Sequence, residues 1–94
     1  FWVRGQGAVT ASGRCRRGGA WGRHAHPGAE NGYAGEGELL LEQDGKPAAT
    51  LRMGQTFLVP AGTVHNATNS GSTTTRLGAT YVVEKGKPLA TPAK

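Results

Sequence analysis

Two of the three histidines in this 94-residue chain, His24 and His26, stand one residue apart, and a carboxylate follows at Glu30. The third histidine, His65, lies far along the chain in the stretch PAGTVHNATN. On a β-strand, residues i and i+2 point to the same face, so His24 and His26 would project together. A turn at Pro27-Gly28 would bring Glu30 back to the same side from a neighbouring strand. The spacing therefore allows imidazole and carboxylate groups to meet at one site.

Neutral imidazole nitrogens and a carboxylate oxygen together suit a divalent transition metal. Other interpretations of these residues stay open at this level. Two histidines spaced by one residue are also typical of a polar strand face. A lone histidine after a Pro-x-Gly turn, such as His65, is also typical of a residue that hydrogen-bonds within its turn.

The elements that must position these residues are short strands. No window shows apolar residues at helical spacing without an interrupting glycine or proline. Strands are predicted at residues 38–43, 49–53, 55–60 and 73–84. Asp44-Gly45 predicts a two-residue hairpin turn between the first two strands. Several short strands separated by turns predict an all-β, antiparallel barrel or sandwich.

Alternation along the predicted strands indicates which side chains face the core. The residues expected there are Met53, Phe57, Leu77, Ala79, Tyr81 and Val83. Tyr33 is expected on the outer surface, and Asn69 is expected to shape the turn after His65. Residues 1–17 are poorly defined, either two short strands at 8–10 and 15–17 or an arm, and the tail GKPLATPAK is expected to lie along the surface.

The length of 94 residues predicts a single domain over 1–94, with a core small enough to benefit from an oligomeric partner. The net charge of +5 comes from residues 1–23, which hold five arginines and no acid, whereas residues 24–94 hold six bases and six acids. We expect this segment to be a solvated arm or edge strand, not a nucleic-acid interface. No apolar stretch approaches the ~20 residues of a membrane span. We expect a soluble protein, and the sequence does not choose between cytoplasm and periplasm.

Two longer motifs surround the histidines. In the first, Gly18, five residues, His24-Ala-His26, three residues, Glu30, six residues and Gly37 follow one another. In the second, Gly54, five residues, Pro60-Ala-Gly62, two residues, His65, three residues and Asn69 follow one another. With this pair of motifs, 16 residues apart, the chain resembles the cupin superfamily at every defined position.

The resemblance implies an antiparallel jelly-roll β-barrel with a metal inside it. The ligands would be His24, His26, Glu30 and His65, holding one divalent ion of iron, manganese, nickel, copper, zinc or cobalt per chain. Four protein ligands would leave one or two coordination positions of a six-coordinate ion open for water, dioxygen or substrate, as a catalytic metal site requires. Glu30 would be a ligand and also a candidate catalytic proton acceptor.

The segment after Glu30, NGYAGEGE, departs from the bulky hydrophobic strand that is usual in cupins. Gly32 and Ala34 share a face with Glu30, so they would either enlarge the cavity beside the metal or loosen the strand, at roughly 0.5–1 kcal/mol per glycine. We expect a looser strand that is packed by a partner subunit, and therefore a homodimer.

The function expected from the resemblance is a metal-dependent dioxygenase acting on a small, phenolic or enol-type substrate. Two alternatives stay open. One is a non-catalytic barrel that binds a metal or a small ligand, and the other is a metal-dependent isomerase or lyase.

Overall fold

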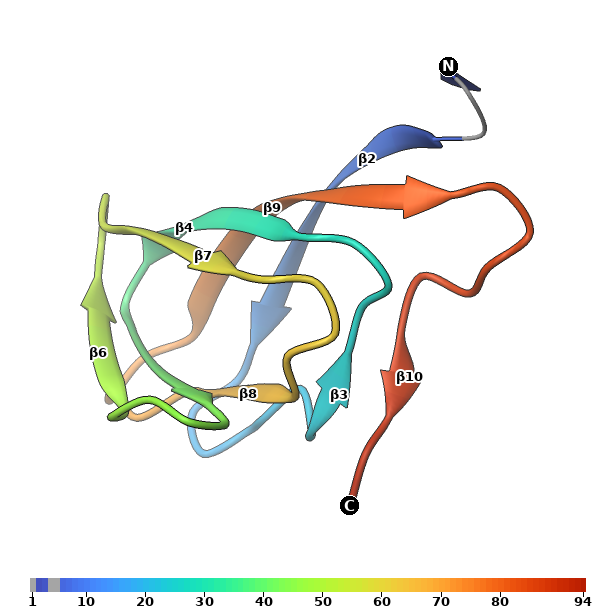
Figure 1. Cartoon of the computed structure of the whole chain (residues 1–94). Coiled ribbons are helices and arrows are strands. Elements are labelled where there is room, and N and C mark those ends of the chain that lie inside the picture. Colours follow the sequence, from blue (N-terminus) through green and yellow to red (C-terminus); the bar gives the residue numbers. More distant parts are fainter. Residues whose placement is uncertain (1, 4–5) are drawn as a thin grey trace.

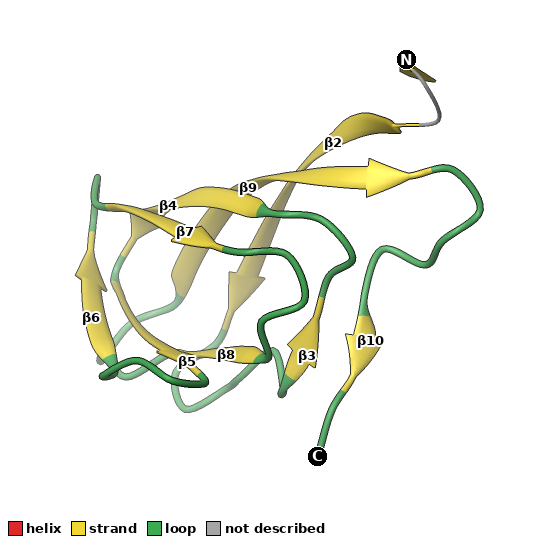
Figure 2. Ribbon diagram, in the orientation of Figure 1, coloured by secondary structure: helices red, strands yellow, loops and turns green. Residues whose placement is uncertain are grey.

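The computed structural model describes residues 2–3 and 6–94. Arg4, which contributes to the basic N-terminal segment, lies outside the described residues. The described chain contains strands and turns but no helix (Figure 2). The strands are β1 Trp2–Val3, β2 Gln6–Cys15, β3 His24–Ala25, β4 Glu30–Glu36, β5 Glu38–Gln43, β6 Ala49–Arg52, β7 Thr56–Val59, β8 His65–Thr68, β9 Thr75–Glu84 and β10 Thr91–Pro92. No described segment forms a helix long and apolar enough to cross a membrane.

The strands form two five-stranded sheets that face each other across the core (Figure 1). One sheet has the order β1-β2-β9-β4-β7, and the other has the order β10-β3-β8-β5-β6. Every pairing between neighbouring strands is antiparallel. The fold is therefore the all-β, antiparallel jelly roll that the sequence predicts. Its sheets are not joined into one hydrogen-bonded ring within the described strands.

The core lies between the two sheets and is built mainly from aliphatic side chains. It comprises Ala34, Leu39, Leu41, Leu51, Phe57, Val59, Ala67 and Leu77. The chain crosses from one sheet to the other at Gly37, between β4 and β5, where φ is +74°. A side chain is strained at such a φ, so glycine is the residue that permits this sharp corner. The corner lets Glu30 and Leu39 reach the same interior from opposite sheets.

The four strands predicted between residues 38 and 84 are confirmed in position, with differences at their ends, and the structure adds a fifth, β8 His65–Thr68, that the sequence does not predict. β5 matches the predicted range 38–43, and β6, β7 and β9 lie within the predicted ranges. The connection after Asp44-Gly45 is longer than the two residues predicted, because β5–β6 pairing ends at the Leu41↔Ala49 pair. Pro47 lies in this connection and has no N–H to continue the ladder.

Two predictions about particular residues are wrong. Residues 8–10 and 15–17 do not form separate strands, because the single strand β2 runs from Gln6 to Cys15 and pairs with β9 along its whole length. Met53 is not a core residue, since β6 ends at Arg52 and the Met53 side chain is 72% exposed in the following turn. Phe57, by contrast, is buried as predicted.

Tyr33 and Asn69 lie where the sequence places them. Tyr33 is 53% exposed on the outer face of β4, where its ring lies over Gly78 of β9. Asn69 is buried, and its side-chain amide donates to the carbonyls of Cys15 and Thr73 at 2.9 and 2.7 Å. Asn69 therefore ties the end of β2 to the turn before β9.

Candidate metal centre

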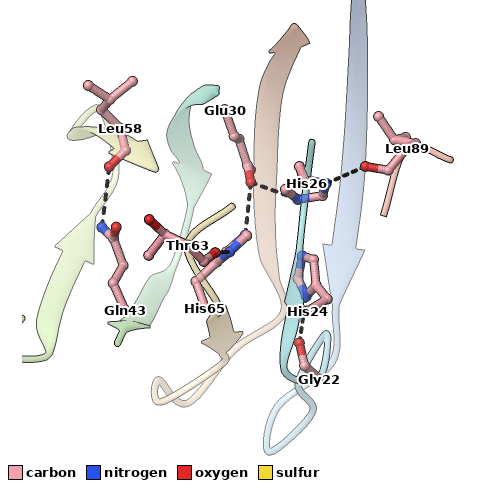
Figure 3. A network of polar contacts seen from close by, with 9 residues as sticks. All are labelled: Gly22, His24, His26, Glu30, Gln43, Leu58, Thr63, His65 and Leu89. Carbon is pink, nitrogen blue, oxygen red and sulfur yellow. Dashed lines mark hydrogen bonds and ion pairs between the residues drawn. The ribbon is translucent and has the colours of Figure 1, made fainter. Parts of the chain in front are cut away.

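The structure brings together the residues that the sequence predicts as ligands. His24, His26, Glu30 and His65 each offer one donor atom, and these atoms all lie within 4.8 Å of one another. Figure 3 shows the histidine side chains and Glu30 pointing toward one another inside the fold. His24 and His65 belong to the sheet that contains β3 and β8, and Glu30 begins β4 in the opposite sheet. The two sheets therefore both supply the site.

Backbone pairing sets the distances between these segments. His24 and His65 are direct partners across β3 and β8. The Pro60-Ala-Gly62 turn is attached to the first motif, because the Gly62 N–H donates to the His26 carbonyl at 2.9 Å. Gly62 has a φ of +74°, which permits the turn that re-aims the chain before His65. The two sequence motifs are thus joined through their backbones.

Each imidazole ring is oriented by a backbone carbonyl at its Nδ1 atom. The Nδ1 of His24 lies 2.6 Å from the Gly22 oxygen, and the Nδ1 of His65 lies 2.9 Å from the Thr63 oxygen. The Nδ1 of His26 lies 2.8 Å from the Leu89 oxygen, in the C-terminal tail. A carbonyl can only accept a hydrogen bond, so Nδ1 carries the proton in each ring. The Nε2 atom of each neutral ring is left with a free lone pair.

The Nε2 atoms meet the Glu30 carboxylate. Glu30 Oε1 lies 3.1 Å from Nε2 of His65 and 3.2 Å from Nε2 of His26. His26, Glu30 and His65 are only 6%, 3% and 3% exposed, so water gives them little screening. Nε2 of His26 is buried and has no hydrogen-bond partner among the described residues. A buried carboxylate that faces lone pairs is costly unless a proton or a cation lies between them.

The electrostatics of the metal-free site differ between the histidines. Burial is the largest influence on His24 and lowers its pKa, outweighing the carbonyl of Gly22. Burial also acts to lower the pKa of His65, but the hydrogen bond and charge of Glu30, together with the Thr63 carbonyl, outweigh it, and the pKa is raised. Without a metal, His65 is therefore the histidine that most readily holds a second proton against Glu30.

The residues present fit a divalent metal. Three imidazole nitrogens and one carboxylate oxygen are the donors that transition metals of borderline softness prefer. The hydrogen bonds at Nδ1 are the outer contacts that fix the tautomer and orientation of ligating histidines. A cation would also satisfy the unpartnered Nε2 of His26.

A small cavity adjoins the candidate metal centre. Its volume is about 20 Å³, and its lining residues are Trp21, His24, Glu30, Leu41, Phe57, His65, Ala67, Leu77 and Tyr81. Such a space holds about one water molecule. In its present shape the cavity therefore admits only a very small ligand.

The structure argues against one of the two interpretations of Gly32, namely that it enlarges the cavity beside the metal. Gly32 on β4 is the direct partner of Phe57 on β7. A Cβ atom at Gly32 would lie only 2.5 Å from Cζ of Phe57, so the phenylalanine ring already occupies that space. Ala34 is fully buried in the core. The small residues after Glu30 make room for Phe57, not for a ligand.

Sequence reasoning missed two aromatic residues and one carbonyl at the site. Tyr81, expected as plain core, is paired with Glu30 across β4 and β9, and its ring centroid lies 4.7 Å from that of His26. Burial, followed by the charge and hydrogen bonding of Glu30, raises the pKa of Tyr81 to about 12. Alternation placed Tyr81 on the inner face, but only the strand register shows that it meets Glu30. Trp21 and the Leu89 carbonyl lie outside the main strands, where the sequence gives no signal.

Comparison with known proteins agrees with this fold and site. A family model described as a cupin domain matches residues 13–84. The chain therefore belongs to the cupin family. No curated protein matches it.

Solved structures add relatives of known or predicted activity. An oxalate oxidase is 26% identical, with a TM-score of 0.82 over 93% of this chain and 46% of its own. A predicted oxalate decarboxylase from Thermotoga maritima is 25% identical, with a TM-score of 0.72 over 80% of this chain and 65% of its own. A DMSP lyase from Ruegeria pomeroyi is 16% identical, with a TM-score of 0.80 over 92% of this chain and 43% of its own, and it shares the fold alone. The chain spans less than half the length of the oxidase and the lyase.

Proposed function

We propose that this chain is a metal-dependent oxidoreductase that uses dioxygen to oxidise a small organic substrate. The observation that carries the proposal is the buried donor set, in which Nε2 of His26 has a lone pair and no partner among the described residues. His24, His26, Glu30 and His65 would hold one divalent ion. A redox-active ion such as iron or manganese would supply Lewis acidity and the one-electron steps that dioxygen requires.

The size of the cavity limits the substrate. A volume of about 20 Å³ does not seat an aromatic ring without movement of Phe57 or Leu77. A small carboxylate is also larger than this space, but it would need less movement of the cavity wall than the phenolic substrate expected from the sequence. The similarity to an oxalate oxidase and to a predicted oxalate decarboxylase, at 26% and 25% identity, supports the same substrate class.

The residues around the donors would handle protons and exclude water. Tyr81 has a pKa raised to about 12, so its hydroxyl is protonated at neutral pH and can donate a hydrogen bond to Glu30 or to a bound carboxylate. Glu30 is the candidate proton acceptor, because its carboxylate is buried beside the open space. Leu41, Phe57 and Leu77 form an apolar wall that keeps bulk water away. Among the described residues that line the cavity there is no lysine or arginine, so the charge of a carboxylate substrate would be met by the metal.

The test loads the metal-free protein separately with iron, manganese and zinc, and measures dioxygen consumption with small carboxylates, phenols and diketones. With oxalate, cleavage of the carbon–carbon bond would yield two molecules of carbon dioxide and transfer two electrons to dioxygen, which would take up two protons from solvent and form hydrogen peroxide. We expect turnover with iron or manganese and none with zinc, which is redox-inert. Glu30→Gln should lower kcat more than it raises KM. If no metal form consumes dioxygen with any member of the panel, the oxidoreductase proposal is wrong.

A second candidate is a metal-dependent lyase or decarboxylase at the same site. The observation that favours it is the pairing of Tyr81 with Glu30, which places a neutral hydroxyl beside a carboxylate that could exchange a proton with substrate. Carbon dioxide release without dioxygen consumption would identify this reaction. Ligand binding with no turnover by any metal form would instead identify a non-catalytic binding module.

A further inference from the structure

The orientation of His26 depends on a distant segment of the chain. The carbonyls that orient His24 and His65 come from residues two positions earlier, within the same local segment. The carbonyl that orients His26 belongs to Leu89, 63 residues later. Figure 3 shows His26 held between Glu30 on one side and Leu89 on the other. His26 therefore keeps its ring orientation only while the C-terminal tail stays in place.

The tail, defined here as the strap of residues 85–94, is attached beside the site by few contacts. Its strand β10 pairs with the two-residue strand β3, and Figure 1 shows the two side by side. The N–H of Ala93 donates to the Arg23 carbonyl at 3.0 Å, and Nε of Arg23 donates to the Lys94 carbonyl at 2.9 Å. The end of the strap is therefore held through both the backbone and the side chain of Arg23.

Arg23 also fastens the strap to a third segment. Its Nη1 and Nη2 atoms donate to the two carboxylate oxygens of Asp44 at 3.0 and 3.1 Å. Asp44 lies in the turn after β5, and its own N–H donates to the Val64 carbonyl, next to His65. A planar guanidinium offers this forked contact and a separate Nε donor at once, which a lysine ammonium does not.

Space exists behind the histidine for its ring to move when the strap is released. A cavity of about 290 Å³ is lined by Ala25, His26, Pro27, Gly62, Lys87, Pro88 and Thr91. The strap contributes Lys87, Pro88 and Thr91 to the lining of this cavity, and His26 lines it too. Loss of the Leu89 carbonyl would remove the contact that keeps Nδ1 protonated and Nε2 aimed at Glu30.

We propose that Arg23 is a positioning residue of the metal centre, which holds the strap 85–94 so that the Leu89 carbonyl fixes the ring of His26. This inference rests on the proposed metal site but not on the reaction carried out there. Arg23 directly precedes His24 in the chain, but its side chain bonds to Lys94 and Asp44 and lines no part of the cavity beside the donors, so the side chain acts through the strap.

The test compares Arg23→Ala, Arg23→Lys and Asp44→Asn with the matched control Arg52→Ala. Arg52 is also an exposed arginine with an ion pair, to Glu38 at 3.4 Å, but it lies on β6 away from the strap. Cobalt(II) binding is measured by titration, and the ring nitrogens of the metal-free proteins are observed by long-range ¹H–¹⁵N NMR. We expect Arg23→Ala and Arg23→Lys to weaken cobalt binding by roughly ten- to a hundredfold, as for other outer contacts of ligating histidines. Asp44→Asn should weaken it less, and Arg52→Ala should leave it unchanged.

The NMR readout distinguishes positioning from a general loss of stability. In Arg23→Ala the Nδ1 proton signal of His26 should exchange faster, while those of His24 and His65 should stay as in the wild type. Cobalt affinity equal to that of Arg52→Ala, or equal changes in all the rings, would overturn the proposal. If the wild type binds no metal, the proposed function fails, and the His26 ring signals of the metal-free variants still decide whether Arg23 positions that ring. If Arg23→Ala does not fold, the cobalt affinity and the His26 ring signals of Asp44→Asn test the same proposal.

Discussion

Substitution of Gly32 by alanine should have two opposite effects on stability, a gain from strand propensity and a loss from a clash with Phe57. Strand propensity alone predicts that alanine is better than glycine by about 0.5–1 kcal/mol. The structure predicts the opposite, because a methyl group at Gly32 would lie 2.5 Å from Cζ of Phe57 and 2.7 Å from the Gly78 oxygen. Carbon atoms in contact normally stay about 3.5–4.0 Å apart, so the ring would have to move by about 1 Å.

The size of the stability change in Gly32→Ala depends on how tightly the ring of Phe57 is packed. The ring is buried in the core, and overpacking of this kind costs about 1–3 kcal/mol. Subtraction of the propensity gain of about 0.5–1 kcal/mol leaves an expected decrease in the free energy of unfolding of about 0–2.5 kcal/mol for Gly32→Ala. The second close contact, with the backbone oxygen of Gly78, places the expected value in the upper half of this range. Each kcal/mol corresponds to about 4–8 °C in Tm for a domain of this size.

Urea denaturation of the metal-free protein measures this change. The matched control is Gly35→Ala on the same strand, where the nearest atom to the added Cβ is 3.6 Å away in Tyr33. Gly35→Ala should be neutral or stabilising. Phe57→Leu should cost less in the Gly32→Ala background than in the wild type, because the smaller side chain relieves the clash. Equal stability of Gly32→Ala and wild type would refute the packing argument.

Three further predictions concern the site and the assembly. The protein should bind about one divalent metal per chain, and His26→Ala or His65→Ala should remove most of it. The metal affinity measured by titration should fall below about pH 6.5, where protons compete with the metal for imidazole. As the pH is lowered, His65, whose pKa is raised, should take up a proton before His24, whose pKa is lowered. Tyr81, with a pKa of about 12, should stabilise the fold fully below about pH 10 and lose that contribution as the pH rises from about 10 to 12, so ultraviolet titration of tyrosinate should show a late step that Tyr81→Phe removes. The chain should sediment as a dimer at micromolar concentration, since Tyr33, Leu58 and Val82 are exposed on one face of the β2-β9-β4-β7 sheet; a monomer with a cooperative melt would contradict this.

The sequence predicts those parts of the structure that local rules determine. Period-two alternation identified the inner face of β9, on which Leu77, Ala79 and Val83 are buried. The turn at Gly62 and the spacing of His24 and His26 identified residues that meet in the structure. These predictions hold because strand geometry and glycine turns act over only a few residues.

The predictions that fail depend on pairing between distant segments. β2 is continuous because β9 pairs with all of it, although glycine and serine at Ser12-Gly13 suggest a break. The alternative interpretation of Gly32, an enlarged cavity, fails because the ring of Phe57 on the neighbouring strand β7 fills that space. The contact between His26 and Leu89 joins two segments that the sequence gives no reason to connect. None of these contacts leaves a local pattern.

The side chains that form the core differ from the groups that orient the candidate metal ligands. The aliphatic core contains none of the candidate ligands, whereas the backbones of His24, Glu30 and His65 take part in the sheet pairing. The rings of the histidines are held by backbone carbonyls instead of by one another, so their orientation does not require a metal. What the metal-free site lacks is a positive charge between Glu30 and the unpartnered Nε2 of His26. The metal-free site therefore lowers the free energy of unfolding of the protein, and binding of a cation between these groups would raise it.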